Sequence, residues 1–139
     1  MTGTATSTAT FPGRFESLDK ISRFVQKAAK QAGLGEEAAY GVELAVDEAC
    51  SNIIEHAYRG EDIGEIECTC EITSSGIKIT LCDYGNPFEP GKIPKPDLTS
   101  PVEKRKKGGL GLFFIDQMMD YAQFEFTDDK NTLTMIKNK

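Results

Sequence analysis

The sequence has no tryptophan, a single histidine, and no apolar run near the roughly 20 residues that a membrane helix needs. Basic residues are also few: 16 lysines and arginines face 22 aspartates and glutamates, which gives a net charge of -6 and a pI near 4.8. A chain this acidic is a poor candidate for following the phosphates of a nucleic acid. The first ten residues lack the basic and apolar regions of a secretory signal. We therefore expect a cytoplasmic protein without direct contact to nucleic acid or membrane.

The composition is that of one globular domain. The chain has 139 residues, of which 39% are hydrophobic and 27% charged, with eight Phe and four Tyr to anchor a core. Cys68 and Cys70 are too close in sequence for the usual zinc-ligand pair. Together with Cys50 and Cys82 they are interpreted as buried, apolar thiols, because disulfides are rare in a reducing compartment.

The first half of the chain predicts two helices. The first ten residues, rich in Thr and Ala, are either a flexible tail or an edge strand that stops at Pro12. Apolar residues at helical spacing follow Ser17, the expected N-cap, and Gly33 and Gly35 close that helix. A longer helix is expected from about Glu36 to Tyr58, with a stop at Gly60. Its buried stripe would be Val42, Val46, Ala49 and Ile53.

The second half predicts two hairpins around an irregular segment. Apolar residues alternate over residues 66–72 and 77–81, with a turn at 74–76. Residues 86–107 contain five prolines and a basic run, and a loop of this length in a compact domain is usually functional. A third helix from about Gly111 to Asp120 and a hairpin that turns at 128–131 complete the chain. This order predicts an α+β two-layer sandwich: a mixed, mostly antiparallel sheet covered on one face by helices.

Three clusters of residues carry candidate chemistry. The first is Glu48, Asn52 and His56, which are spaced four residues apart and form one stripe on the second helix. An Asn oxygen is a ligand that Mg²⁺ accepts, and a Glu one turn away can orient or deprotonate a hydroxyl. The alternative for this cluster is an ordinary solvated helix face.

The second cluster is the run from Asp83 to Phe88, directly after a predicted strand. Asp83 at a strand end can accept a hydrogen bond from the amine of adenine, and Gly85 has no Cβ to obstruct a base. A plain turn is the alternative, because Asp-x-Gly is a common turn sequence.

The third cluster is a basic run, Lys104–Lys107, followed by Gly108-Gly109-Leu110-Gly111-Leu112 and a predicted helix. Glycines before a helix N-terminus expose backbone N–H groups that can hold phosphates. The sequence is neither a P-loop nor a dinucleotide-binding fingerprint, and the alternative is a Gly-rich hinge.

Taken together, these clusters resemble the motifs of the Bergerat-fold ATPases, a group that includes histidine kinases and gyrase. The chain is most similar to the bacterial anti-sigma-factor serine kinases, on the strength of Asp83-x-Gly85-x-Pro87-Phe88 and the run from Gly108 to Asp120. The resemblance spans about Phe11 to Lys137. It implies a histidine-kinase-like ATPase domain over 11–139, with an ATP lid at about 86–107.

The resemblance also implies roles for single residues. Glu48 would be the catalytic base, Asn52 would ligate Mg²⁺, and His56 would belong to the same nucleotide-binding box. Asp83 would read adenine, and Gly85 would let the base approach. The remaining ATP-binding residues would be Lys107, Gly109, Leu110, Gly111, Leu112 and, through a water, Thr132.

The function implied by this resemblance is that of a protein-serine kinase that phosphorylates a STAS-domain anti-anti-sigma partner and sequesters a sigma factor. Homodimers are common in the resembled family. A second hypothesis is an ATP-dependent binding switch without phosphotransfer, although a pure binder has no need of a base such as Glu48. A histidine-kinase fragment is a third, but the chain contains no dimerisation helices or phosphoacceptor domain.

Overall fold

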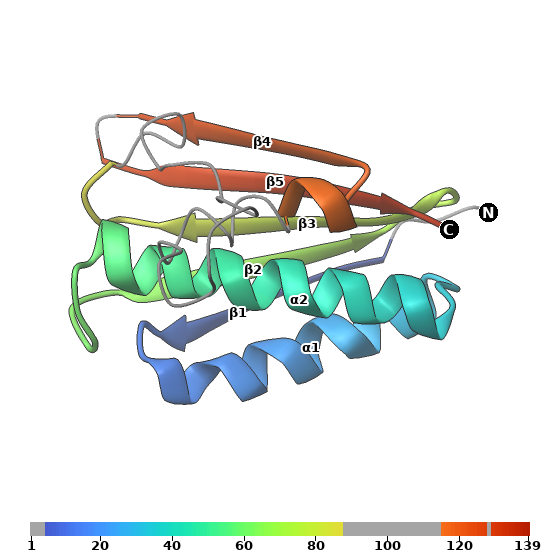
Figure 1. Ribbon diagram of the computed structural model, residues 1–139, viewed down its shortest axis with the longest axis horizontal. Helices are drawn as coiled ribbons and strands as arrows, with labels where there is room; N and C mark the ends of the chain where they lie inside the picture. The colour runs from blue at the N-terminus through green and yellow to red at the C-terminus, as the bar shows by residue number, and fades with distance from the viewer. Residues whose placement is uncertain (1–4, 88–114, 128) are drawn as a thin grey trace, which may run out of the picture.

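Alternating apolar and polar residues build one five-stranded sheet in the order β1-β2-β3-β5-β4 (Figure 1). The computed structural model describes residues 5–87, 115–127 and 129–139. Within these residues all four strand pairs are antiparallel, so the parallel pair that a mixed sheet requires is not among them. The strands are β1 (Ala5–Pro12), β2 (Glu65–Ile72), β3 (Gly76–Asp83), β4 (Tyr121–Phe126) and β5 (Asn131–Asn138).

Strand β1 decides between the two alternatives for the start of the chain. From Ala5 onward the chain is the edge strand, and it ends at Pro12 as predicted. Proline has no N–H to donate to a neighbouring strand, so it is tolerated at such an edge. Phe11 anchors the strand to the helical layer, since its ring meets that of Phe24 edge-on at a centroid distance of 6.0 Å.

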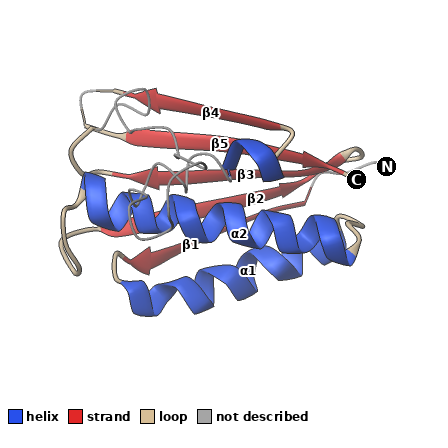
Figure 2. Ribbon diagram, viewed as in Figure 1, coloured by secondary structure: helices blue, strands red, loops and turns tan. Residues whose placement is uncertain are grey.

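The helices lie together on one face of the sheet (Figure 2). This arrangement confirms the predicted two-layer α+β sandwich. Residues 115–118 are helical as well, which agrees with the later part of the predicted third helix; residues 111–114 lie outside the described residues. No helix in the described part of the chain is both long enough and apolar enough to cross a membrane. The helical elements are η1 (Phe15–Ser17), α1 (Leu18–Gln31), α2 (Glu36–Asn52) and η2 (Ile53–Ala57).

The core lies between the helices and the inward face of the sheet. The predicted stripe of α2 is buried, and it meets inward residues of β2, β3 and β5 such as Ile66, Leu81 and Met135. All four cysteines are buried free thiols, as predicted. Burial raises the pKa of the Cys50 thiol well above its ordinary range, which keeps this side chain unreactive.

The two ends of α1 compare differently with the prediction. Gly33, with φ 85°, closes the helix as expected: its N–H donates to Lys30 O, and Leu34 N–H donates to Ala29 O. Ser17 stands at the N-cap position of α1 as predicted, but its side chain makes no capping hydrogen bond. The reason is the short helix η1, which places Ser17 in a helical conformation, whereas a capping serine needs an extended one.

The second predicted helix is present, but its winding changes before it ends. The α-helix stops at Asn52, and η2 continues it as one wide π-helical turn in which Tyr58 N–H donates to Ile53 O at 2.9 Å. The predicted stop at Gly60 is one residue late, because the residue in the left-handed conformation is Arg59, with φ 58°.

Hydrogen bonds from the segment after β3 hold this wide turn in place. Asn86 N–H donates to Ala57 O at 2.8 Å, and Tyr84 N–H donates to the Tyr58 hydroxyl at 3.1 Å. The Tyr58 hydroxyl in turn donates to Glu65 O at the start of β2. Gly85 lies against the Ala57 backbone so closely that an added Cβ would stand 2.7 Å from the Ala57 carbonyl carbon and oxygen.

We predict that Gly85→Ala destabilises the fold by about 1–3 kcal/mol, because the new methyl group meets backbone that cannot turn aside. Thermal unfolding followed by circular dichroism measures this loss. Gly35→Ala is the matched control, since an added Cβ there meets nothing within 4 Å; because Gly35 is the N-cap of α2, its cost should be limited to about 0.5–1 kcal/mol. Equal melting temperatures for the two variants would contradict the close packing at Gly85.

A group of carboxyls lies where α1 and α2 pack together. Asp47 is half-buried, and its Oδ1 is buried without a hydrogen-bond partner among the described residues. Burial, and then the negative charges of Glu43, Glu48 and Asp19, raise the pKa of Asp47 from 3.8 to about 6. The folded state therefore favours protonated Asp47. Relative to neutral pH, protonated Asp47 therefore raises the free energy of unfolding. This contribution is fully present below about pH 3.8 and is lost as the pH rises through about 6.

We predict that Asp47→Asn stabilises the protein at pH 7.5 and has little effect at pH 4. Solvent screening at this half-exposed site should reduce the gain to about 1 kcal/mol, or about 4 °C in melting temperature. Scanning calorimetry across this pH range measures the difference between the variant and the wild type. Glu125→Gln, at an exposed carboxyl on β4, is the control. A stabilisation by Asp47→Asn that does not change with pH would rule out the ionisation of Asp47 as its cause.

Candidate functional site

Asp83 is the last residue of β3, and it is the one charged residue that is buried in the described part of the chain. Inward positions of β3 alternate from Ile77 through Ile79 and Leu81 to Asp83, so its carboxylate points toward the helical layer and is 2% exposed. Gly85 N–H and Asn131 Nδ2 both donate to Oδ1, at 2.9 and 2.8 Å. No described residue donates to Oδ2, which leaves one carboxylate oxygen available as an acceptor.

The protonation of Asp83 is set by two opposing effects. Burial raises the pKa of its carboxyl, while the hydrogen bonds from Asn131 and Gly85 act to lower that pKa. The net direction is upward. An additional hydrogen bond donated to Oδ2 would act in the same direction as those from Asn131 and Gly85 and would lower the pKa of Asp83.

Helix α2 contributes the opposite wall of the site. Asn52 is 3% exposed, and its Nδ2 is buried without a hydrogen-bond partner among the described residues. Glu48, one turn earlier, is half-exposed; burial and then the negative charge of Glu55 raise its pKa. A raised pKa suits a general base, because it strengthens the affinity of the carboxylate for a proton.

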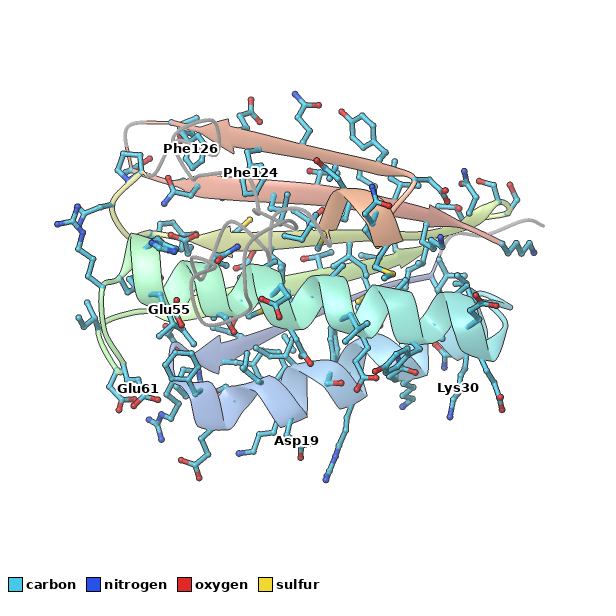
Figure 3. All side chains as sticks on the ribbon, in the orientation of Figure 1. Asp19, Lys30, Glu55, Glu61, Phe124 and Phe126 are labelled. Carbon is cyan, nitrogen blue, oxygen red and sulfur yellow. The ribbon has the colours of Figure 1, made fainter. Side chains whose placement is uncertain are left out.

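A small cavity lies between Asn52 and Asp83. Its volume is about 10 Å³, which is close to the room that a single water needs. Figure 3 shows Phe124 and Phe126 on β4, at the end of the sheet where η2 lies, and their rings stack at a centroid distance of 6.0 Å. The cavity is lined by Ala49, Asn52, Ile53, Leu81, Asp83, Phe124, Phe126, Asn131, Thr132 and Leu133.

Of the other predicted site residues that the structure describes, Glu48, His56 and Gly85 do not line this cavity. Glu48 lies in the last turns of α2 and His56 in η2, on either side of Asn52 along the chain. A π-helix has more residues per turn than an α-helix, so each residue of η2 turns the chain through a smaller angle about the helix axis. His56 therefore lies closer to the face that carries Glu48 and Asn52 than it would in a continuous α-helix. Gly85 lines a neighbouring open groove, and its missing side chain makes room for the Ala57 backbone.

The hairpin between β4 and β5 differs from the prediction. Asn131 was expected in the turn, but it is the first residue of β5 and lies opposite Asp83. Thr132, the residue predicted to reach adenine, lines the cavity, and its hydroxyl lies 3.8 Å from Cys82 Sγ. The side chain that contacts Asp83 is therefore that of Asn131. Its alternation with the inward residues Leu133 and Met135 was the one signal in the sequence that indicated this orientation.

The third sequence cluster falls outside the described residues. This applies to Lys107, Gly109, Leu110, Gly111 and Leu112, and to the predicted lid beyond Pro87.

Comparison with known proteins gives a consistent result. The profile of the histidine kinase-like ATPase domain matches residues 11–137. Serine-protein kinase RsbW from Bacillus cereus is 31% identical over 130 residues, which cover 91% of this chain and 80% of that protein. RsbW proteins from Bacillus anthracis and Bacillus thuringiensis match with the same identity and coverage.

Two solved structures share the fold. The crystal structure of the RsbU and RsbW domains of Rv1364c from Mycobacterium tuberculosis matches with a TM-score of 0.68 and 14% identity; the match covers 96% of this chain and 32% of that one. The histidine kinase domain of a blue-light activated kinase from Erythrobacter litoralis matches with a TM-score of 0.53 and 14% identity, over 89% and 59% of the two chains. The family profile and the RsbW relatives lead to one conclusion: the chain belongs to the histidine kinase-like ATPase family.

Proposed function

We propose that this protein binds Mg-ATP between α2 and the end of the sheet and transfers the γ-phosphate to a serine or threonine of a STAS-domain partner. The observation that carries the proposal is Asp83: a buried carboxylate with one oxygen held by two donors and the other free to accept from the amine of adenine. The similarity to serine-protein kinases supports phosphotransfer as the reaction.

The walls of the cavity suit a purine, but they must move to admit it. Leu81, Leu133, Phe124 and Phe126 offer the apolar contacts that base binding needs. A cavity that holds about one water is too small for a purine. Strand β4 carries both phenylalanines and has no strand beyond it in the described sheet. We therefore expect the wall formed by β4 to yield.

The residues of α2 fit the phosphate end of the nucleotide. Asn52 would offer its carboxamide oxygen to Mg²⁺, a cation that prefers oxygen ligands. Its buried Nδ2 has no hydrogen-bond partner among the described residues, which is typical of a group that binds a ligand. Bound Mg²⁺ would neutralise phosphate charge. Glu48 would accept the proton of the attacking hydroxyl. From outside the described residues, Lys107 would supply positive charge, and Gly109 and Gly111 would supply N–H groups to the phosphates.

The partners follow from the family resemblance. Phosphorylation of a STAS-domain anti-anti-sigma protein would stop it from capturing the kinase, which would then be free to sequester a sigma factor. A homodimer and a cytoplasmic location complete this proposal. The competing function is an ATP-dependent switch without phosphotransfer, and the half-buried carboxylate of Glu48 favours the kinase.

The first test concerns the base. Mg-ATP should raise the melting temperature, and Mg-GTP should do so much less, because the 6-oxo group of guanine is an acceptor that would face Asp83. Asp83→Asn should lower the affinity for ATP by about 1–3 kcal/mol, measured by calorimetry. Glu37→Gln, at an exposed carboxyl in the first turn of α2, is the control and should bind ATP like the wild type. Equal stabilisation by ATP and GTP would remove Asp83 from its proposed role.

The second test separates the kinase from the switch. Glu48→Gln should reduce phosphotransfer to a STAS-domain partner by about 10²–10⁴-fold and change ATP affinity by no more than about a few-fold, because the amide keeps the shape but cannot accept a proton. Asn52→Ala should lower Mg-ATP affinity and transfer together. Radiolabel transfer and calorimetry are the paired measurements.

The control for this test is Glu37→Gln, an exposed carboxyl in the first turn of α2. Transfer at the wild-type rate by Glu48→Gln would contradict the role of a base. If the wild type binds ATP but labels no partner serine or threonine, the switch without phosphotransfer is the function.

A further inference from the structure

Asn131 is a buried polar residue whose side chain contacts three acceptors near the end of β3. Its residue is 4% exposed, and its Nδ2 donates to three acceptors: Asp83 Oδ1 at 2.8 Å, Gly85 O at 3.2 Å and Asn86 O at 3.3 Å. These acceptors belong to the end of β3 and to the segment that follows it. One carboxamide nitrogen thus ties the start of β5 to the place where the chain leaves β3.

These three acceptors determine which way the carboxamide faces. If the amide were rotated by half a turn, Asn131 Oδ1 would stand against a carboxylate oxygen and two carbonyl oxygens, all of which are acceptors. The rotated form is therefore strongly disfavoured. Asn131 Oδ1 consequently lies on the side of the amide turned away from Asp83.

Asn131 Oδ1 is buried and has no hydrogen-bond partner among the described residues. A buried acceptor without a donor is rare in folded proteins, and it calls for an explanation such as a water or a ligand. Asn131 and Asp83 line the same small cavity, whose other walls are largely apolar. The cavity therefore brings together two acceptors, Asp83 Oδ2 and Asn131 Oδ1, that receive no hydrogen bond from a described residue; Asn52, whose Nδ2 is a buried donor without a partner among those residues, also lines the cavity but bonds to neither.

We propose that Asn131 determines base specificity: its Nδ2 fixes Asp83, and its Oδ1 accepts a hydrogen bond that originates from the 6-amino group of adenine, directly or through one water. This inference rests on the proposed ATP binding and adds to it a second acceptor at the base. An amine offers two N–H groups to these two acceptors. A purine without the amine leaves both unpaired, and sites built in this way discriminate strongly against such analogues.

The test measures how much of the affinity depends on the amine. The probes are Mg-ATP and the Mg complex of purine riboside triphosphate, which lacks the 6-amino group, and calorimetry gives the ratio of their affinities. We expect the wild type to prefer ATP by at least about 100-fold, and Asn131→Ala to reduce this preference by about tenfold or more. Thr134→Val, the next half-buried hydroxyl along β5, is the control and should keep the wild-type preference.

The outcomes distinguish this inference from a purely structural role. If Asn131→Ala weakens both nucleotides equally and keeps the wild-type preference for the amine, Asn131 is a structural brace and the inference is overturned. If Asn131→Ala fails to fold by circular dichroism, Asn131→Thr decides: a reduced preference supports the inference, and an unchanged one overturns it. A wild type that binds neither nucleotide refutes the proposed function itself. A wild type that binds both equally refutes amine recognition alone.

Discussion

The antiparallel pairing of β3 with β5 is the constraint on which the candidate site depends. It sets Asp83 opposite Asn131, 48 residues further along the chain, and so provides the donor that holds the carboxylate. The buried pairs that precede it, Ile79 with Met135 and Leu81 with Leu133, fix this register. A slip of one residue would turn the side chains of one strand to the other face and separate Asp83 from its donor.

The second fixed point is the contact between the chain leaving β3 and the last turn of the long helix. Asn86 and Tyr84 donate to Ala57 O and to the Tyr58 hydroxyl, and Gly85 fits against the Ala57 backbone without a side chain. These contacts hold the helical wall and the end of β3 at one spacing, while β4 remains the part of the wall that can yield. The polar groups of both walls are thus positioned before any ligand arrives, which reduces the cost of ordering them on binding.

Charge sets a further requirement on this site. Burial raises the pKa of Asp47, Glu48 and Asp83, which means that the fold holds these carboxyls where ionisation is unfavourable. Such positions reduce stability and are typical of functional regions. A polyphosphate near Glu48 would also be repelled unless positive charge accompanied it. This is why the proposed function includes Mg²⁺ and Lys107 together with the residues of α2.

The sequence by itself determined the elements, because hydrophobic periodicity is a local property. The alternation at Ile77, Ile79 and Leu81 predicted the strand at whose end Asp83 lies, and helical spacing predicted the helix that carries Asn52. The tertiary structure alone decided three features: the π-helical turn, the reason for glycine at Gly85, and the partnership of Asn131 with Asp83. Each depends on contacts between residues far apart in sequence, whose register and spacing no local pattern encodes. The sequence therefore predicted Asn131 in a turn, whereas the pairing of β5 with β3 places it opposite Asp83, to which its side chain donates a hydrogen bond.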